Sequence, residues 1–145
     1  MAKDTFHETV KKALEKENWE ITHDPFTVKL TKRKVFIDLG AEKLIIAEKE
    51  HRKIAVEIKS FISLLPLKDF YNALGQYQLY ILALKHRFPD RVLYLAMPDE
   101  SYELLRSDDL LAELIDELDL NYLIFNSKQK TITKWIPEIK SYKQF

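Results

Sequence analysis

The chain has 145 residues, 46% of them hydrophobic, and its 23 Lys and Arg residues balance its 23 Asp and Glu residues. This length favours a single domain over residues 1–145, with a core of ordinary size. The absence of cysteine excludes disulfides and thiolate nucleophiles, and no run approaches the roughly 18 apolar residues of a membrane span, so we expect a cytoplasmic protein.

The first part of the chain is predicted to form a helix followed by several strands. Apolar residues at helical spacing predict an amphipathic helix over residues 4–17, closed by Asn18. A polar turn is expected around Glu50 and His51, between the last two strands. Alternating or apolar segments predict strands over residues 19–22, 26–30, 34–39, 43–48 and 53–59.

The second part alternates helices and strands. A long helix is predicted to begin near Asp69, after Pro66. Its expected buried face consists of Phe70, Ala73, Leu74, Tyr77, Ile81 and Leu84. The remaining predicted elements are a central strand over 91–96, an acidic helix over 108–118 and strands over 121–126 and 131–136. The order predicts an α/β fold in which helices cover a mixed sheet.

Charge is unevenly distributed although the net charge is zero. Residues 27–61 carry nine Lys or Arg against five acids, whereas residues 99–120 carry nine acids and one Arg. The basic residues Lys29, Lys32, Arg33 and Lys34 cluster at an expected turn. They could contact phosphate, or they could solvate the turn and discourage edge-to-edge aggregation.

The segment 54–61 is the most informative stretch. Strand side chains alternate, so Glu57 and Lys59 share one face with Ala55, while Val56 and Ile58 point the other way. Two ionisable groups in so apolar a strand are costly without a partner. An alternative is an edge strand that exposes Glu57 and Lys59 to solvent.

A metal ion would be a suitable partner for Glu57. Asp38 ends another apolar run nineteen residues earlier, so the two carboxylates could share Mg²⁺ or Mn²⁺ if their strands are neighbours. The Ile58 carbonyl could add a ligand, and Lys59 would place positive charge beside a scissile phosphate. An Asp followed after about twenty residues by Glu-x-Lys resembles the metal-dependent nucleases of the restriction-endonuclease-like PD-(D/E)xK superfamily.

Two further features have a functional and an ordinary interpretation. Gln76 could orient the attacking water, or it could be an exposed helical glutamine off the apolar face. Gly75, which costs roughly 1 kcal/mol inside a helix, could allow close packing on the sheet or the approach of a ligand backbone. The four histidines show no metal-ligand spacing.

The whole chain also resembles a family. From residue 3 to about 136 it is similar to XisH, the cyanobacterial fdxN element excision controlling factors. The segments that carry the resemblance, in order, are residues 4–7, 22–25, 37–43, 54–61, 73–76 and 92–96. The resemblance implies a restriction-endonuclease-like fold and an accessory role in excision of a DNA element, alongside a site-specific recombinase and a small XisI-type partner.

Two functional hypotheses follow. In the first, the protein cleaves DNA with Mg²⁺ or Mn²⁺ held by Asp38, Glu57 and the Ile58 carbonyl, while Lys59 positions or activates water with help from Gln76. In the second, it is a non-catalytic adaptor that binds a XisI-type protein and regulates recombination. The two differ in their need for a metal ion.

Overall fold

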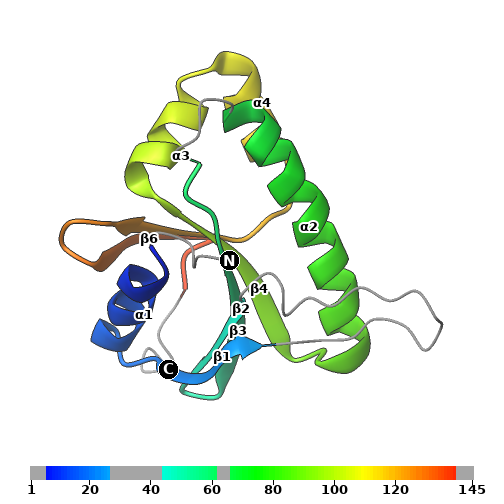
Figure 1. The fold of residues 1–145 in the computed structure, drawn as a ribbon. Coiled ribbons are helices and arrows are strands. Elements are labelled where there is room, and N and C mark those ends of the chain that lie inside the picture. The colour runs from blue at the N-terminus through cyan, green and yellow to red at the C-terminus, as the bar shows by residue number, and fades with distance from the viewer. Residues whose placement is uncertain (1–5, 27–43, 62–65, 140–145) are drawn as a thin grey trace.

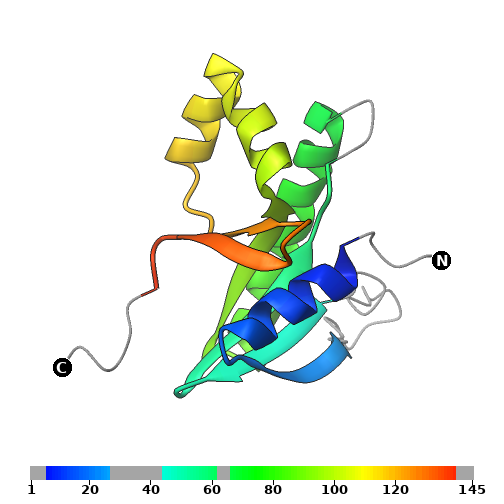
Figure 2. The ribbon, with the colours of Figure 1, turned by 90° about the vertical axis from the view of Figure 1, so that its left-hand side faces the viewer.

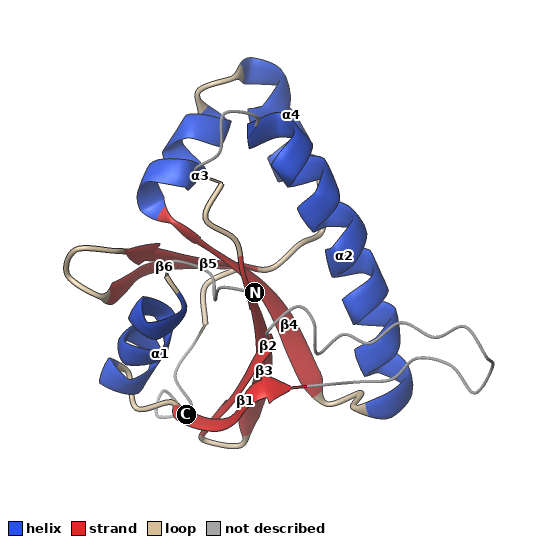
Figure 3. Cartoon of the chain, in the orientation of Figure 1, coloured by secondary structure: helices blue, strands red, loops and turns tan. Residues whose placement is uncertain are grey.

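The computed structural model describes residues 6–26, 44–61 and 66–139. Figures 1 and 3 show the arrangement of the helices and strands. In chain order they are α1 (His7–Lys16), β1 (Glu20–Phe26), β2 (Leu44–Lys49), β3 (Arg52–Ile58), α2 (Pro66–Arg87), β4 (Arg91–Pro98), α3 (Asp99–Arg106), α4 (Asp109–Glu117), β5 (Tyr122–Asn126) and β6 (Thr131–Ile136).

The strands form a six-stranded mixed sheet in the order β1-β2-β3-β4-β5-β6. The central pairs β3/β4 and β4/β5 are parallel, and the outer pairs are antiparallel. Helix α2 forms the crossover between the parallel strands β3 and β4, as parallel pairing requires. The predicted α/β class is thus confirmed, and the arrangement is consistent with a restriction-endonuclease-like fold.

The sheet separates two hydrophobic cores. Ala55 joins the core under α2, α3 and α4, whereas Ile54, Val56 and Ile58 join the core under α1. Figures 1 and 2 show α1 on the opposite side of the central strands from α2. Because β3 is buried on both faces, it is a central strand, and the edge-strand alternative for residues 53–59 is wrong.

Two predicted chain reversals are confirmed. Asn18, just beyond the end of α1, has a positive φ of 70°, which is the left-handed conformation that often follows a helix. Glu50 and His51 have positive φ values of 50° and 68° in the turn between β2 and β3. This geometry matches a tight hairpin that follows the twist of its strands.

Helix α2 differs from its prediction in start and orientation. It begins at Pro66 rather than near Asp69, because proline suits the first helical turn, where its missing N–H is not needed. Ile81 is 37% exposed, whereas Tyr80 is 1% exposed and belongs to the core. The expected apolar face was wrong at this point because α2 carries apolar residues on two sides.

The remaining differences concern short elements. Strand β1 covers Glu20–Phe26, so it is longer than the strand expected over 19–22, while residues 27–30 of the strand expected over 26–30 lie outside the described residues. Helix α3 was not predicted; it has eight residues, only two of them buried, and therefore gives a weak periodic signal. The predicted strand over 34–39 lies outside the described residues. None of the described helices is long and apolar enough to cross a membrane.

The Tyr77 hydroxyl links α2 to the sheet. It donates a hydrogen bond to the Leu93 carbonyl at 2.8 Å and accepts one from the Asn121 backbone N–H at 3.0 Å. Burial raises the pKa of Tyr77 to about 12, so the hydroxyl keeps its proton at neutral pH. This residue therefore fixes the middle of α2 against β4 and the start of β5.

Replacing Tyr77 with Phe should lower the free energy of unfolding by about 1–2 kcal/mol, because it leaves the Asn121 backbone N–H without its partner and removes one of the two side-chain hydrogen bonds that the Leu93 carbonyl accepts. Tyr122→Phe is the matched control, since the buried Tyr122 hydroxyl has no hydrogen-bond partner among the described residues. That control should be neutral or stabilising. Urea unfolding checks both, and equal losses in the two variants would contradict the role given to Tyr77.

Candidate metal and catalytic site

Glu57 is a buried carboxylate near the end of the central strand β3. It is only 2% exposed, and by strand alternation it faces the α2 side of the sheet together with Ala55. Burying a charged carboxylate is costly unless it is paired, hydrogen-bonded or bound to a metal. Its position therefore singles it out from the acids on the surface.

Lys59 lies beside Glu57, as the alternation predicted. Its Nζ is 3.9 Å from Glu57 Oε2, which is an ion-pair distance but too long for a hydrogen bond between them. The Lys59 side chain is 26% exposed, so the pair has a buried acid and a partly accessible cation. The Lys59 backbone N–H donates a hydrogen bond to the Ala96 carbonyl at 2.9 Å, which continues the pairing of β3 with β4.

The chain after Lys59 is held by neighbouring elements. The Ser101 hydroxyl, on α3, donates a hydrogen bond to the Ser60 carbonyl. Phe61 has a positive φ of 53°, and its ring packs edge-on against Phe70 of α2, with centroids 5.9 Å apart. We did not predict Ser101 as a supporting residue, because nothing local in the sequence relates it to a residue 41 positions away.

Gln76 is less exposed than expected. It is partly buried, and its side-chain carbonyl oxygen is inaccessible to solvent. It lies on α2 between Ala73, Tyr77 and Tyr80, which all pack into the core under that helix. The interpretation of Gln76 as an ordinary exposed helical glutamine is therefore wrong, and its role in orienting water stays a prediction.

The other proposed ligands are placed only in part. Asp38 lies outside the described residues, so its convergence with Glu57 stays a prediction. The Ile58 side chain is buried in the core under α1, and Ile58 pairs in register with Ala96 of β4. The structure thus brings Glu57 and Lys59 together, while a role for the Ile58 carbonyl as a ligand stays a prediction.

A second polar cluster joins α1 to β1. His7, which is 2% exposed, places its Nε2 2.8 Å from Asp24 Oδ1, and Lys11 Nζ lies 2.8 Å from Asp24 Oδ2. His7, Glu8 and Asp24 each place one potential metal-ligand atom within 4.8 Å of the other two. The spacing of the histidines in the sequence did not indicate this cluster. Lys11 already neutralises Asp24 and lies 4.0 Å from Glu8, so the geometry is that of an ion-pair cluster.

The protonation of this cluster follows from its contacts. Burial by itself raises the pKa of Asp24, but its close contacts with Lys11 and His7 outweigh this effect and hold the pKa below its ordinary value. The hydrogen bond to Asp24 raises the pKa of Lys11. Both groups are therefore charged at neutral pH and attract each other across the contact between α1 and β1.

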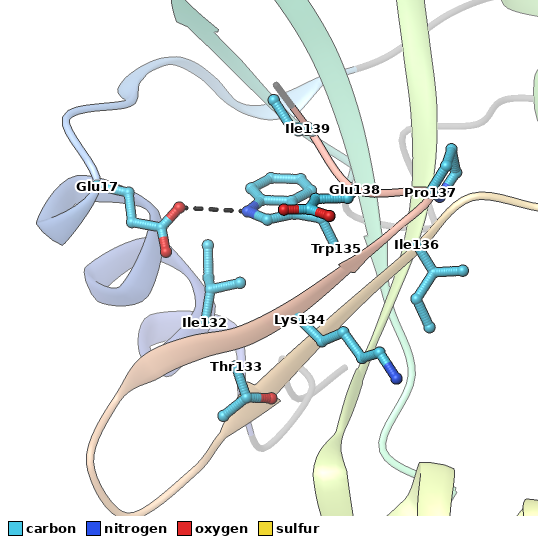
Figure 4. Close-up of a pocket in the computed structure, with 9 residues that line it drawn as sticks. All are labelled: Glu17, Ile132, Thr133, Lys134, Trp135, Ile136, Pro137, Glu138 and Ile139. Carbon is cyan, nitrogen blue, oxygen red and sulfur yellow. Dashed lines mark hydrogen bonds between the residues drawn. The ribbon is translucent and has the colours of Figure 1, made fainter. Parts of the chain in front are cut away.

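A hollow of about 530 Å³ lies elsewhere, beside β6 and the residues that follow it. Figure 4 shows its lining, in which the Trp135 indole N–H donates a hydrogen bond to the carboxylate of Glu17, the residue after α1, at 3.2 Å. The Trp135 ring also packs against Tyr94 and Trp19, with centroids 5.0 and 5.6 Å apart. Neither Glu57 nor Lys59 lines this hollow, so its size alone does not make it the reactive site.

Comparison with known proteins identifies the family. The family model described as XisH protein matches residues 1–133. The chain belongs to the XisH family. Its match includes both Glu57 with Lys59 and the His7–Asp24 contact, whereas most of the hollow at Trp135 lies beyond it.

Two solved structures resemble this XisH-family chain along nearly their whole lengths. A crystal structure of an XisH family protein from Nostoc punctiforme PCC 73102 is 43% identical, with a TM-score of 0.80, and the match covers 91% of this chain and 98% of that one. A fdxN element excision controlling factor protein from Anabaena variabilis is 41% identical, with a TM-score of 0.81 and coverage of 92% and 99%. Comparison with curated proteins finds no match.

Replacing Asp24 with Asn in this XisH-family chain should lower the free energy of unfolding at pH 7 by about 1–3 kcal/mol, because charged hydrogen bonds are lost. Since the folded-state pKa of Asp24 is lowered, its stabilisation is complete above the ordinary carboxyl pKa of about 4 and disappears as pH falls through the lowered value. Denaturant unfolding of the wild type and of Asp24→Asn, from pH 7 down to a pH below the lowered pKa of Asp24, measures the effect.

Asp116→Asn provides a control for that measurement. Asp116 pairs with Arg106 at 2.9 Å, but its side chain is 65% exposed, so solvent screens the pair. We expect little change in stability from this substitution. A loss at pH 7 as large as that of Asp24→Asn, or an Asp24→Asn effect that persists in acid, would contradict the buried-cluster interpretation.

Proposed function

We propose that the protein is an accessory factor in the excision of a DNA element and that it cleaves DNA with a divalent metal ion. The solved relative from Anabaena variabilis is described as a fdxN element excision controlling factor, which supports the first part. The observation that supports the second is the buried Glu57 carboxylate with Lys59 3.9 Å away at the end of a central strand. This arrangement also supports placing the chain in the PD-(D/E)xK superfamily.

The chemistry of the donor set fits a hard cation. Glu57 and Asp38 would hold Mg²⁺ or Mn²⁺, and the Ile58 carbonyl would add a third oxygen ligand, the type that these ions prefer. Such an ion lowers the pKa of bound water and neutralises charge that develops on a phosphoryl group. Burial of Glu57 keeps its carboxylate in one position, which reduces the rearrangement needed for ion binding.

The protein's own groups have separate tasks in this proposal. Lys59, partly accessible beside the buried Glu57, places positive charge where a DNA phosphate would approach and helps to position the attacking water. Gln76, from the helix that covers this face, orients that water. Two hydrogen bonds keep the backbone of this segment fixed: the Lys59 backbone N–H donates to the Ala96 carbonyl, and the Ser101 hydroxyl donates to the Ser60 carbonyl.

Glu57→Gln should reduce metal-dependent DNA cleavage at least about a hundredfold, because it keeps the side-chain shape but removes the charge that holds the ion. Lys59→Ala should reduce cleavage without an equal loss of Mn²⁺ affinity. Supercoiled, linear, branched and single-stranded DNA should be tested with Mg²⁺ and with Mn²⁺, while calorimetry measures ion binding separately.

Two substitutions in the same sheet serve as controls. Glu48→Gln changes an acid on β2 that pairs with Arg91, and Lys53→Ala changes a cation at the other end of β3 that pairs with Asp90. Both should retain cleavage, with thermal unfolding used to verify their folding. Unchanged cleavage in both Glu57→Gln and Lys59→Ala would reject the proposed site.

The second candidate function is a non-catalytic adaptor that binds a XisI-type protein and regulates a site-specific recombinase. An exposed apolar surface on the acidic α3 and α4 helices favours it: Leu104 is 55% exposed and Leu110 is 74% exposed. Isolated exposed leucines are common, but two on adjacent helices offer a contact for another protein. This function needs no metal ion.

Co-expression with a XisI-type protein tests the adaptor function. We expect a stable complex at low and moderate salt, with Leu104→Glu and Leu110→Glu each weakening it because they place charge in an apolar contact. Glu57→Gln should leave the complex intact. Failure of the wild-type pair to co-purify at either salt concentration would count against this function.

A further inference from the structure

Helix α2 has two apolar faces. One face packs into the core through Phe70, Ala73, Tyr77, Tyr80 and Leu84. The other face is exposed, with Leu67 at 41%, Tyr71 at 58%, Ile81 at 37% and Leu82 at 52%. These residues recur with helical spacing, so they form one stripe along the outer side of α2. We call these four residues, with Gly75 between them, the outer α2 stripe.

Gly75 lies near the middle of the outer α2 stripe. A Cβ atom built at this position meets nothing within 4 Å, so Gly75 is not needed for packing within the described part of the chain. The expectation that it packs closely on the sheet is therefore wrong. Glycine nevertheless costs a helix roughly 1 kcal/mol relative to alanine. A second helix that crosses at Gly75 could approach the α2 backbone closely, because glycine has no side chain to hold it away.

The outer stripe carries both a projecting side chain and a hollow. Tyr71 projects from it, and a hollow of about 220 Å³ is lined by Leu82, Ala83, His86 and Arg87. Tyr71 and Leu82 are three turns apart on the same side, about 16 Å along the helix. Gly75 lies between them. A surface with complementary features on the two sides of its centre can pair with itself through a two-fold axis.

We propose that two copies of this chain associate through antiparallel contact of their α2 helices, which cross at Gly75. In this arrangement Tyr71 of each copy fills the hollow at Leu82 and His86 of the other. The phenol ring packs on Leu82, and its hydroxyl and π face meet the His86 and Arg87 side chains. A single two-fold axis therefore places each of the two Tyr71 side chains in the hollow of the other copy.

The charges of α2 favour the antiparallel orientation. Its last turn carries Lys85, His86 and Arg87, whereas Lys68 and Asp69 in its first turn balance each other in charge. Parallel association would place the two basic ends together. Antiparallel association that crosses at Gly75 separates them by about 33 Å, well beyond the Debye length of about 8 Å at physiological salt, and it opposes the two helix dipoles.

The expected contact area sets the strength of the dimer. The outer α2 stripe, with its flanking polar residues, would bury on the order of 1,000 Å² over the two copies, which is the lower end for a specific interface. We therefore expect a dissociation constant on the order of micromolar. Sedimentation velocity of the wild-type chain should show conversion from monomer to dimer as concentration rises from about 0.1 to about 100 µM, a range that brackets this constant.

Gly75→Glu tests the crossing point. It should raise the dissociation constant about a hundredfold, because it places a side chain and an unpaired charge between the helices. The monomer should be no less stable to heat at low concentration, because glutamate forms helices better than glycine and its Cβ meets open space. Tyr71→Glu should have the same effect on association. Leu110→Glu, at an exposed position on α4, is the matched control and should leave the dimer intact.

The absence of cysteine from the sequence allows the orientation to be tested directly. Leu67→Cys and Lys85→Cys copies should form a disulfide when mixed, because antiparallel helices bring position 67 of one copy beside position 85 of the other. Neither variant alone should cross-link. A wild-type chain that stays monomeric throughout, a dimer unaffected by Gly75→Glu and Tyr71→Glu, or Leu67→Cys that cross-links to itself would overturn the proposal.

Discussion

Parallel pairing of β3 with β4 is the constraint on which the candidate site depends. It places β3 in the middle of the sheet, where Ala55 packs under α2 and Val56 packs under α1. A carboxylate on such a strand is taken out of water, and Glu57 is accordingly only 2% exposed. Burial of a charge at this position needs compensation, to which the Lys59 ammonium group contributes from 3.9 Å away.

Period-two alternation was sufficient to predict much of this arrangement. It placed Glu57 and Lys59 on one face, because a central strand offers only two directions for its side chains. The sequence could not predict contacts between distant elements. Tertiary packing creates both the hydrogen bond from the Ser101 hydroxyl to the Ser60 carbonyl and the contact of His7 with Asp24. Helix α3 was missed because it buries little, and the predicted face of α2 was wrong at Ile81 because both sides of that helix are apolar.

Helix α2 connects the two proposals through its opposite faces. Its inner side holds Tyr77 on the sheet and brings the buried oxygen of Gln76 to the side of the sheet that carries Glu57. Its outer side presents Tyr71 and Gly75 to a second copy. A dimer of this kind would carry two metal-dependent sites related by a two-fold axis, each on the inner side of a shared helix pair. The two proposals nevertheless rest on different residues and can fail separately.

A crystal structure of the protein soaked in Mn²⁺ tests the central claim most directly, since the anomalous signal of manganese locates the ion. The account predicts one ion with oxygens of both Asp38 and Glu57 within about 2.0–2.6 Å, with Lys59 beside it. Asp38 and Glu57 on opposite faces of the sheet, or no ion at Glu57 at saturating Mn²⁺, would contradict the account and leave the adaptor as the better function.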